Sequence, residues 1–373
     1  MTDVNVPYHK QMMFWLVLLV AAGWGIYALS GVMLPFVAGL ALGYLLDPLA
    51  RRLQMLGLSR FVATIVILAF CAVALLLLAL LLGPVLGRQL SGFLDHLPLY
   101  VQKFQDLALI QANLFSEKYG NAILDKLGMS AGQGGTFDAQ KTLSDFAGQA
   151  SQWIAGFIRS LISGGAALIS LLSLLVVTPV VAFYILIDWD KMIAAIDSLL
   201  PLAQRDTIHQ IARDIDRALA GFIRGQSLVC LILGLWYGIG LSLIGLNFGF
   251  LIGFTAGMLS FIPYVGSLTA LALSLVIAIV QGWPNWSLTF MALAVVGTGQ
   301  FMEGNVLSPK LVGASVGLHP VWLMFALLAF GSVFGFTGLL IAVPVAAALG
   351  VLVRFALAQY RRSKFYLDMD PAP

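Results

Sequence analysis

Long apolar stretches separated by short polar segments make up most of the chain. No Asp, Glu, Lys or Arg occurs from Gln11 to Leu46, from Gly225 to Met302 or from Leu311 to Val353. About 18 consecutive apolar residues are enough to cross a bilayer as a helix, and each of these blocks is longer than that. The pattern therefore predicts an all-α polytopic membrane protein with several crossings.

Glycine, proline and charged residues divide the N-terminal part into separate segments. The predicted spans in this part are 12–30, 32–46, 61–83 and 160–187. Arg51, Arg52 and Arg60 lie in the connection before the third span, and the positive-inside rule places this connection and the N-terminus in the cytoplasm. Pro179 lies inside the fourth span, where it removes a backbone donor and is expected to kink the helix.

Two segments mix charged and apolar residues at helical spacing. In the first, 88–152, the spacing is clearest for Leu90, Leu94, Leu97, Val101 and Phe104. Three predicted spans lie between the cytoplasmic N-terminus and this segment, so it is predicted as an extracytoplasmic amphipathic helical insert. Its apolar stripe packs either on the membrane helices of its own chain or on another copy. The second, 201–226, is predicted as a cytoplasmic amphipathic helix, either a membrane-surface connector or a coupling element.

The charge-free block from Gly225 to Met302 is too long for one crossing. Within it, 227–244 and 286–302 are predicted as full spans. The pieces 249–262 and 266–280 are each shorter than the roughly 20 residues of a full crossing. Together they are predicted to form a re-entrant hairpin of two half-length helices, occupying about 249–280.

A polar segment from Gln300 to Pro320 separates the last two apolar blocks. After it, the piece 318–330 is short and the piece 333–353 is longer, and the chain ends in a basic tail that should be cytoplasmic. These features predict a second hairpin near 318–353, although two ordinary spans would leave the same charged residues on the same side of the membrane. Opposed hairpins of broken helices are the arrangement with which many transporters build a site near mid-membrane. The polar segment is equally compatible with an interfacial loop whose charges face water.

Polar and helix-breaking residues near the two hairpins form the expected pathway for a solute or an ion. They are Glu303, Asn305, Lys310, Pro263, Tyr264, Ser267, Pro309 and Asn247. A carboxylate at the centre of a span costs roughly 2.5–3.5 kcal/mol unless it is paired, hydrated or protonated. Glu303 is therefore the expected binder of a proton or a cation, with Lys310 as its nearest candidate partner. If Glu303 lies in the headgroup layer, these residues carry no transport.

Small residues at a spacing of four predict close packing of helix backbones. The clearest case is the triple Gly249, Gly253 and Gly257, although 38 glycines in the chain also produce such spacings by chance. The expected hinge and packing residues are Gly249, Gly253, Gly257, Gly266, Gly331, Gly335 and Pro179.

Composition narrows the functional classes. Hydrophobic residues make up 60% and charged residues 10% of the 373 residues, against roughly 45–50% and 25% in soluble proteins. The net charge of +3 gives no reason to expect nucleic acid as a partner. The chain has no P-loop motif and no paired Cys or His spacing, so no cofactor or metal is expected. Gly313-Ala-Ser-Val-Gly317 matches the serine hydrolase pattern but lacks the required strand-to-helix setting, so no enzyme activity is expected.

Several short motifs together resemble the autoinducer-2 exporter family, also called the permease-like AI-2E family. The motifs are Gly221-Phe-Ile-Arg-Gly-Gln226, Phe261-Ile-Pro-Tyr-Val-Gly266, Glu303-Gly-Asn-Val-Leu-Ser-Pro-Lys310, Val316-Gly-Leu-His-Pro320 and Gly335-Phe-Thr-Gly-Leu-Leu-Ile-Ala-Val-Pro344. The resemblance covers nearly the whole chain. It implies a multi-pass transporter of the bacterial inner membrane with about eight membrane segments. It also implies export of autoinducer-2 for some members and sodium/proton exchange for others.

The functional hypothesis that follows is a secondary transporter that exports a small polar solute such as autoinducer-2, driven by a proton or sodium gradient. A sodium (or other cation)/proton antiporter, a non-transporting membrane scaffold and a passive channel are the alternatives. The expected partners are the lipid bilayer, the solute, the coupling ion and possible further copies of the chain, with both termini cytoplasmic.

The sequence also predicts how the chain is divided. The divisions are N-terminal membrane helices (1–87), the insert (88–152), the fourth span with its cytoplasmic turn (153–200), the cytoplasmic amphipathic helix (201–226), a membrane transport core (227–358) and a cytoplasmic tail (359–373).

Overall fold

The computed structural model describes a helical protein. The described residues are 13, 17, 23–25, 27–115, 165–313, 317, 319–363 and 366. They form helices, and no strand occurs among them. Much of the predicted span 12–30 and residues 116–152 of the predicted insert lie outside the described residues. Within the described part, six helices are long and apolar enough to cross a membrane, so the chain is an all-α polytopic membrane protein.

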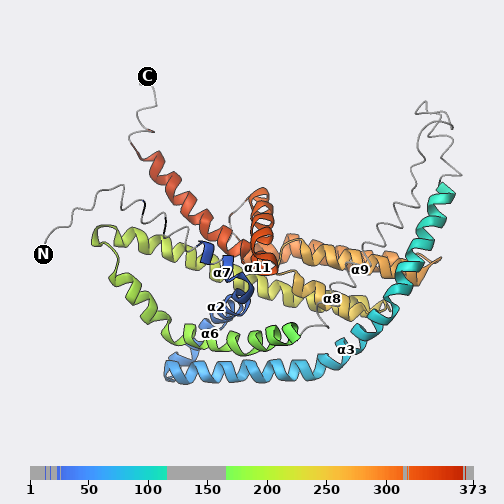
Figure 1. Ribbon diagram of the computed structural model, residues 1–373, viewed down its shortest axis with the longest axis horizontal. Helices are drawn as coiled ribbons and strands as arrows, with labels where there is room; N and C mark the ends of the chain where they lie inside the picture. The colour runs from blue at the N-terminus through green and yellow to red at the C-terminus, as the bar shows by residue number, and fades with distance from the viewer. Residues whose placement is uncertain are drawn as a thin grey trace. The chain divides into compact units, whose positions relative to one another are not determined.

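In chain order the helices are η1 (Ser30–Val32), α2 (Met33–Met55), α3 (Arg60–Phe115), α6 (Gly165–Ser198), η3 (Leu202–Gln204), α7 (Arg205–Leu243), α8 (Gly249–Leu259), α9 (Val265–Gly282), α10 (Ser287–Met302), η4 (Glu303–Val312) and α11 (Pro320–Arg361). The connections from η1 to α3 and from α6 to η4 are short (Figure 1). The element η4 is a π-helix of ten residues and contains Pro309. The polar segment therefore does not continue α10 as a plain α-helix.

Contacts divide the chain into two compact units. Unit 1 comprises Met1–Val73, Leu171–Ser227 and Leu307–Pro373. Unit 2 comprises Ala74–Ser170 and Leu228–Val306. Four elements change unit along their length, because α3, α6, α7 and η4 each begin in one unit and end in the other.

In unit 1, α2 packs closely on α6. A Cβ at Gly39 would lie 2.7 Å from the Val181 side chain, and one at Gly43 would lie 2.9 Å from that of Ile185. The glycines thus let the two helix backbones approach each other. The Thr178 hydroxyl donates to the Pro35 carbonyl over 3.3 Å, one residue before Pro179 of α6.

Arg60, at the start of α3, joins α2 and α6 at this end of unit 1. Its guanidinium donates to the Leu186 carbonyl over 2.7 Å and to Asp190 over 2.9 Å. It also forms an ion pair of 3.4 Å with Asp47 of α2. Only 18% of the Arg60 side chain is exposed, so these bonds are partly shielded from water.

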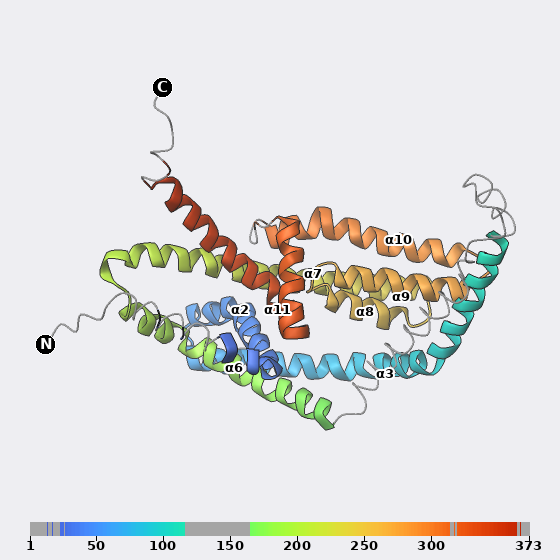
Figure 2. The ribbon, with the colours of Figure 1, turned by 45° about the horizontal axis from the view of Figure 1, so that its top comes forward.

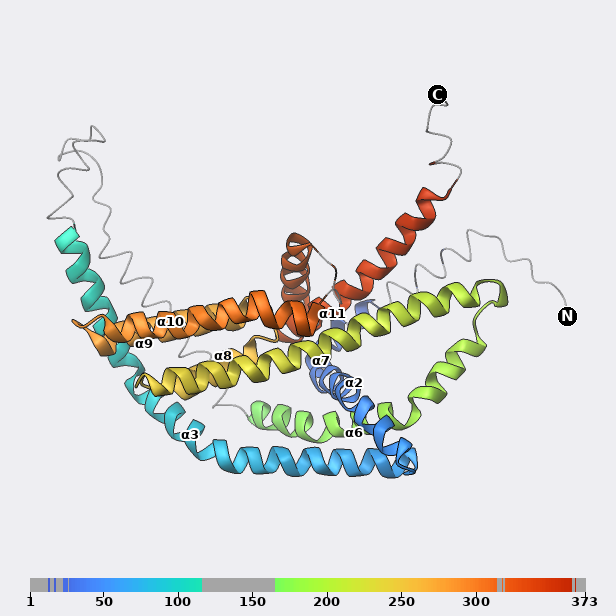
Figure 3. The same cartoon turned by 180° about the vertical axis from the view of Figure 1, so that it is seen from behind.

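The helix α11 in unit 1 bends sharply at Gly335, and Figure 3 shows its two arms. Gly335 has φ 58° and ψ −137°, a combination that is not helical and that favours glycine. A Cβ at Gly338 would collide with the Phe330 carbonyl, and one at Gly331 would lie 2.8 Å from Leu339. Residues eight positions apart lie about 12 Å apart along a straight helix, so the chain reverses here.

Unit 2 contains a hairpin of α8 and α9 and a third helix, α10, beside α9 (Figure 2). The α8 helix has 11 residues, fewer than a crossing requires, whereas α9 has 18. Glycines bring α8 against α7, because a Cβ at Gly253 would overlap the Tyr237 and Gly238 backbone and one at Gly257 would overlap Gly234. Whether this hairpin is re-entrant stays a prediction.

Several helices run further than the sequence predicted. The connection that was predicted to begin at Asp47 is instead helical as far as Met55. Within it, Arg51 donates a hydrogen bond to Asp47 one turn back. The third span does not end at Gly83-Pro84, because α3 continues through Pro84 to Phe115. The amphipathic segment and the span after it form one helix, α7, which contains no proline to end it.

Candidate functional site

The turn between α8 and α9 gathers several of the predicted pathway residues within unit 2. Pro263 and Tyr264 lie in this turn, and Tyr264 has a left-handed backbone with φ 69°. The Ser267 hydroxyl donates to the Tyr264 carbonyl over 3.1 Å. Ser260 is buried, and Gly266 lies so close to it that a Cβ would overlap the Ser260 side chain. The turn is therefore held closed by glycine contact and local hydrogen bonds.

A second group of polar side chains connects α7 with the end of α10. The Gln300 side-chain amide donates to the Glu303 carboxylate over 3.3 Å and to the Tyr237 hydroxyl over 3.4 Å. Tyr237 is fully buried, and Gly299 leaves room for its ring, since a Cβ there would overlap the ring. Cys230, about two turns before Tyr237 on the same face of α7, is also buried. The three hydrogen-bonded residues are called the Tyr237–Gln300–Glu303 chain below.

Packing places the Tyr237–Gln300–Glu303 chain and the α8–α9 turn at the same end of unit 2. The helices α9 and α10 contact each other and are joined by a short connection, so they run antiparallel. Tyr264 precedes the first residue of α9, and Glu303 follows the last residue of α10. Antiparallel neighbours joined in this way have those two ends side by side (Figure 2).

Asn247 does not belong to this group. Its backbone N–H donates to the Gln281 side chain over 2.8 Å, and its side-chain amide donates to the Tyr100 hydroxyl over 2.8 Å. Gln281 is near the last residue of α9, which is about 25 Å along the helix from Tyr264. Asn247 therefore fixes the opposite end of the hairpin, together with Gln89, which accepts a hydrogen bond from the Leu251 N–H at the start of α8.

The remaining predicted residues lie on η4. The Asn305 side-chain amide donates back to the Phe301 carbonyl over 3.0 Å, so it supports the local helix. Pro309 and Lys310 are exposed and belong to unit 1, whereas Glu303 belongs to unit 2. The hydrogen-bond partner of the Glu303 carboxylate is Gln300, one turn back, and its pairing with Lys310 stays a prediction.

The half-buried Glu303 carboxyl has an altered acidity. Glu303 follows the last residue of α10 and lies in none of the six apolar helices of spanning length. Burial raises the pKa of this carboxyl above its usual range, and the hydrogen bond from Gln300 opposes part of that rise. The group can therefore hold a proton more readily than an exposed glutamate, or bind a cation when it is ionised.

A family model described as AI-2E family transporter matches residues 16–358, nearly the whole chain. The chain belongs to this family. As an AI-2E family member, it is a multi-pass membrane transporter whose surroundings are a lipid bilayer and whose substrate is a small solute. The family model and the relatives are described as transporters, transport proteins and permeases.

The AI-2E member is similar to curated proteins over most of their length. YrrI of Bacillus subtilis, named as a transport protein, is 30% identical over 329 residues, which cover 86% of each chain. PerM of Escherichia coli, named as a permease, is 26% identical over 342 residues, 91% of each chain. YueF of Bacillus subtilis, named as a transport protein, is 26% identical and covers 86% of this chain and 82% of its own. None of these names specifies a solute.

Two residues of the Tyr237–Gln300–Glu303 chain were missing from the sequence prediction for this AI-2E member. Gln300 stands three positions before Glu303, a spacing that places both side chains on one helical face, so it had a sequence signal. Tyr237 had none, because it lies in an apolar stretch of α7 and meets Gln300 only through helix packing.

Proposed function

We propose that the protein is a secondary transporter that exports a small polar solute across the bacterial inner membrane, driven by a proton or sodium gradient. The Tyr237–Gln300–Glu303 chain beside the α8–α9 turn is the observation that carries this proposal. Glu303 supplies the carboxylate for the coupling ion, and the turn residues Pro263, Tyr264 and Ser267 supply the polar wall for the solute. Autoinducer-2 is the first solute to test, because the family resemblance implies its export for some members.

The mechanism rests on the linkage between the carboxylate and the helix packing. Gln300 donates to Glu303 and to Tyr237 at the same time, so a proton or cation on Glu303 competes with one of these hydrogen bonds. Loss of the Gln300–Glu303 bond leaves the Gln300 amide free to turn, and its other hydrogen bond is the one that links the end of α10 to Tyr237. Ion binding thereby changes how α10 is held beside the α8–α9 turn. Solute access changes with it, as alternating access requires.

The decisive experiment uses the full chain reconstituted in lipid vesicles. Flux of autoinducer-2 and of other small polar solutes is measured with an imposed proton gradient, with a sodium gradient and with none. Glu303→Gln keeps the size of the side chain but removes its charge, and should abolish the gradient-dependent part of the flux. Asp206→Asn makes the same chemical change on the exposed face of α7, and should leave flux unchanged. Undiminished coupling in Glu303→Gln vesicles would overturn the proposed role.

A cation/proton antiporter is the second candidate, favoured by the same carboxylate. A half-buried carboxylate can bind a proton and a sodium ion in turn, and their exchange needs no solute. Sodium efflux that responds to the proton gradient in vesicles without added solute would favour this candidate. Solute flux that ignores every ion gradient would instead favour a passive channel, and no flux of any kind would favour a membrane scaffold.

A further inference from the structure

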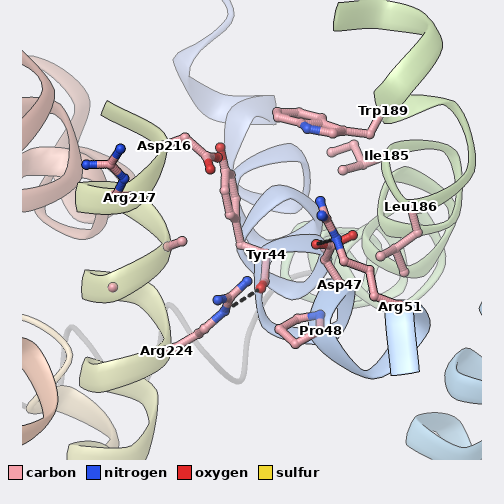
Figure 4. A pocket seen from close by; sticks show the side chains of 13 residues that line it. Tyr44, Asp47, Pro48, Arg51, Ile185, Leu186, Trp189, Asp216, Arg217 and Arg224 are labelled. Carbon is pink, nitrogen blue, oxygen red and sulfur yellow. Dashed lines mark hydrogen bonds and ion pairs between the residues drawn. The ribbon is translucent and has the colours of Figure 1, made fainter. Parts of the chain in front are cut away.

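Unit 1 contains a cavity of about 470 Å³ (Figure 4). None of the residues that line it is among those assigned to transport above. Its walls come from α2, α6 and α7, and a volume of roughly 300–1,000 Å³ is typical of small-molecule sites. The polar lining consists of Tyr44, Asp47, Arg51, Trp189, Asp216, Arg217 and Arg224. The apolar lining includes Pro48, Ile185 and Leu186.

The cavity lies where all three of its helices change from apolar to charged. Asp47 is the first charged residue of α2, and Asp188, next to Trp189, is the first of α6. In α7, Arg224 is the last charged residue before the apolar part. Such transitions mark the boundary between hydrocarbon and headgroups, where Trp and Tyr side chains also gather. The cavity is therefore at the depth of lipid headgroups.

One side of the cavity presents a carboxylate and two aromatic rings. Asp216 of α7 faces the Tyr44 hydroxyl, and among the described residues no cation forms an ion pair with it. The Tyr44 and Trp189 rings meet edge to face, with centroids 5.8 Å apart. A carboxylate next to two aromatic rings is a favourable environment for an ammonium group, which can pair with the carboxylate and lie over a ring face.

The other side presents a guanidinium with free donors. Arg51 donates from Nε to Asp47 over 2.8 Å, and 61% of its side chain is exposed. Guanidinium carries five N–H donors, so most of those of Arg51 can still bind a phosphate. Arg217 points away from the cavity toward its partner Asp214, and Arg224 donates to the Tyr44 carbonyl over 3.1 Å (Figure 4).

We propose that this cavity binds an ammonium–phosphate zwitterion of the phosphoethanolamine type, with the ammonium against Asp216, Tyr44 and Trp189 and the phosphate on Arg51. At headgroup depth the natural source is a phosphatidylethanolamine lipid whose acyl chains follow the apolar walls. A soluble phosphoethanolamine derivative carries the same two charges. Binding of either ties α2, α6 and α7 together at this end of unit 1.

The test measures lipid binding to the purified full chain in detergent by native mass spectrometry. Phosphatidylethanolamine should bind about tenfold more tightly than phosphatidylglycerol, which has the phosphate but no ammonium. Asp216→Asn should remove this preference, and Arg51→Gln should weaken both lipids about tenfold. Asp206→Asn on α7 and Arg52→Gln beside Arg51 make the same changes outside the cavity and should alter neither.

The source is decided by competition with soluble glycerophosphoethanolamine. Displacement of the lipid by this compound supports the proposed chemistry with a free zwitterion as ligand, and failure to displace it supports a lipid held also by its acyl chains. If Asp216→Asn does not fold, Trp189→Leu replaces it and should weaken only phosphatidylethanolamine. Equal binding of both lipids by the parent protein, or unchanged binding in Asp216→Asn and Arg51→Gln, would overturn the proposal.

Discussion

Gln300 Nε2 lies 3.3 Å from Glu303 Oε2, and the same amide group reaches the buried Tyr237 hydroxyl at 3.4 Å. One side chain thus connects an ionisable group to the interior of unit 2. The proposed ion coupling therefore has a direct route from the charge of Glu303 to the packing of α10.

The pH dependence of transport tests this connection. The raised pKa of the Glu303 carboxyl means that it keeps its proton at pH values where an exposed glutamate is already ionised. Flux that requires the ionised carboxylate should therefore fall as the pH drops, beginning at a higher pH than an exposed glutamate gives. The measurement is vesicle flux across the mildly acidic range. Glu303→Gln should give a flat profile there, and a profile with the parent's shape would assign the titration to another group.

Gly253→Ala tests the close approach of α8 to α7. Its Cβ would overlap the Tyr237 and Gly238 backbone, which cannot move aside as a flexible side chain can. Overpacking of this kind costs typically about 1–3 kcal/mol, so the melting temperature in detergent should fall. Gly297→Ala is the matched control, because nothing lies within 4 Å of its Cβ and alanine is the better helix former. Equal melting temperatures for the two variants would show that α8 does not pack as described.

Gly335→Ala tests the bend in α11. The backbone at Gly335, with φ 58° and ψ −137°, is one that alanine adopts only with strain of about 1–3 kcal/mol. We expect a lower melting temperature and a larger distance between spin labels on the two arms, because a straighter α11 relieves the strain. An unchanged distance between the labels would mean that neighbouring contacts, rather than the glycine, hold the bend.

Arg60→Gln tests the junction of α2, α3 and α6. The substitution removes the bonds to Asp47 and to the Leu186 carbonyl, both partly shielded, and the more exposed pair with Asp190. Hydrogen bonds to charged groups contribute about 1.5–3 kcal/mol, so the free energy of unfolding should fall by roughly that amount. Arg52→Gln removes an exposed arginine nearby and should change it by less than about 0.5 kcal/mol. Similar losses in both variants would indicate a general charge effect.

Parts of the candidate site could be predicted from local sequence, and other parts could not. Pro263 with Tyr264 marked the turn between α8 and α9, because proline and a short apolar piece limit how a helix continues there. Asn247 was grouped with Glu303 on polarity alone. The structure instead places it with Gln281 and Tyr100 at the other end of α9, since polarity does not say which end of a hairpin a loop occupies.

The sequence by itself determined the class of the protein, its family and some of its helix breaks, such as the turn at Pro263 and Tyr264, because hydropathy, proline and glycine act over short distances along the chain. Only the tertiary structure decided that Tyr237 meets Gln300 and that Tyr44, Trp189 and Asp216 line one cavity. Such groups come from different helices, and which helices become neighbours depends on backbone approach at residues such as Gly43 and Gly253. That approach is a property of two packed surfaces, so neither segment specifies it alone.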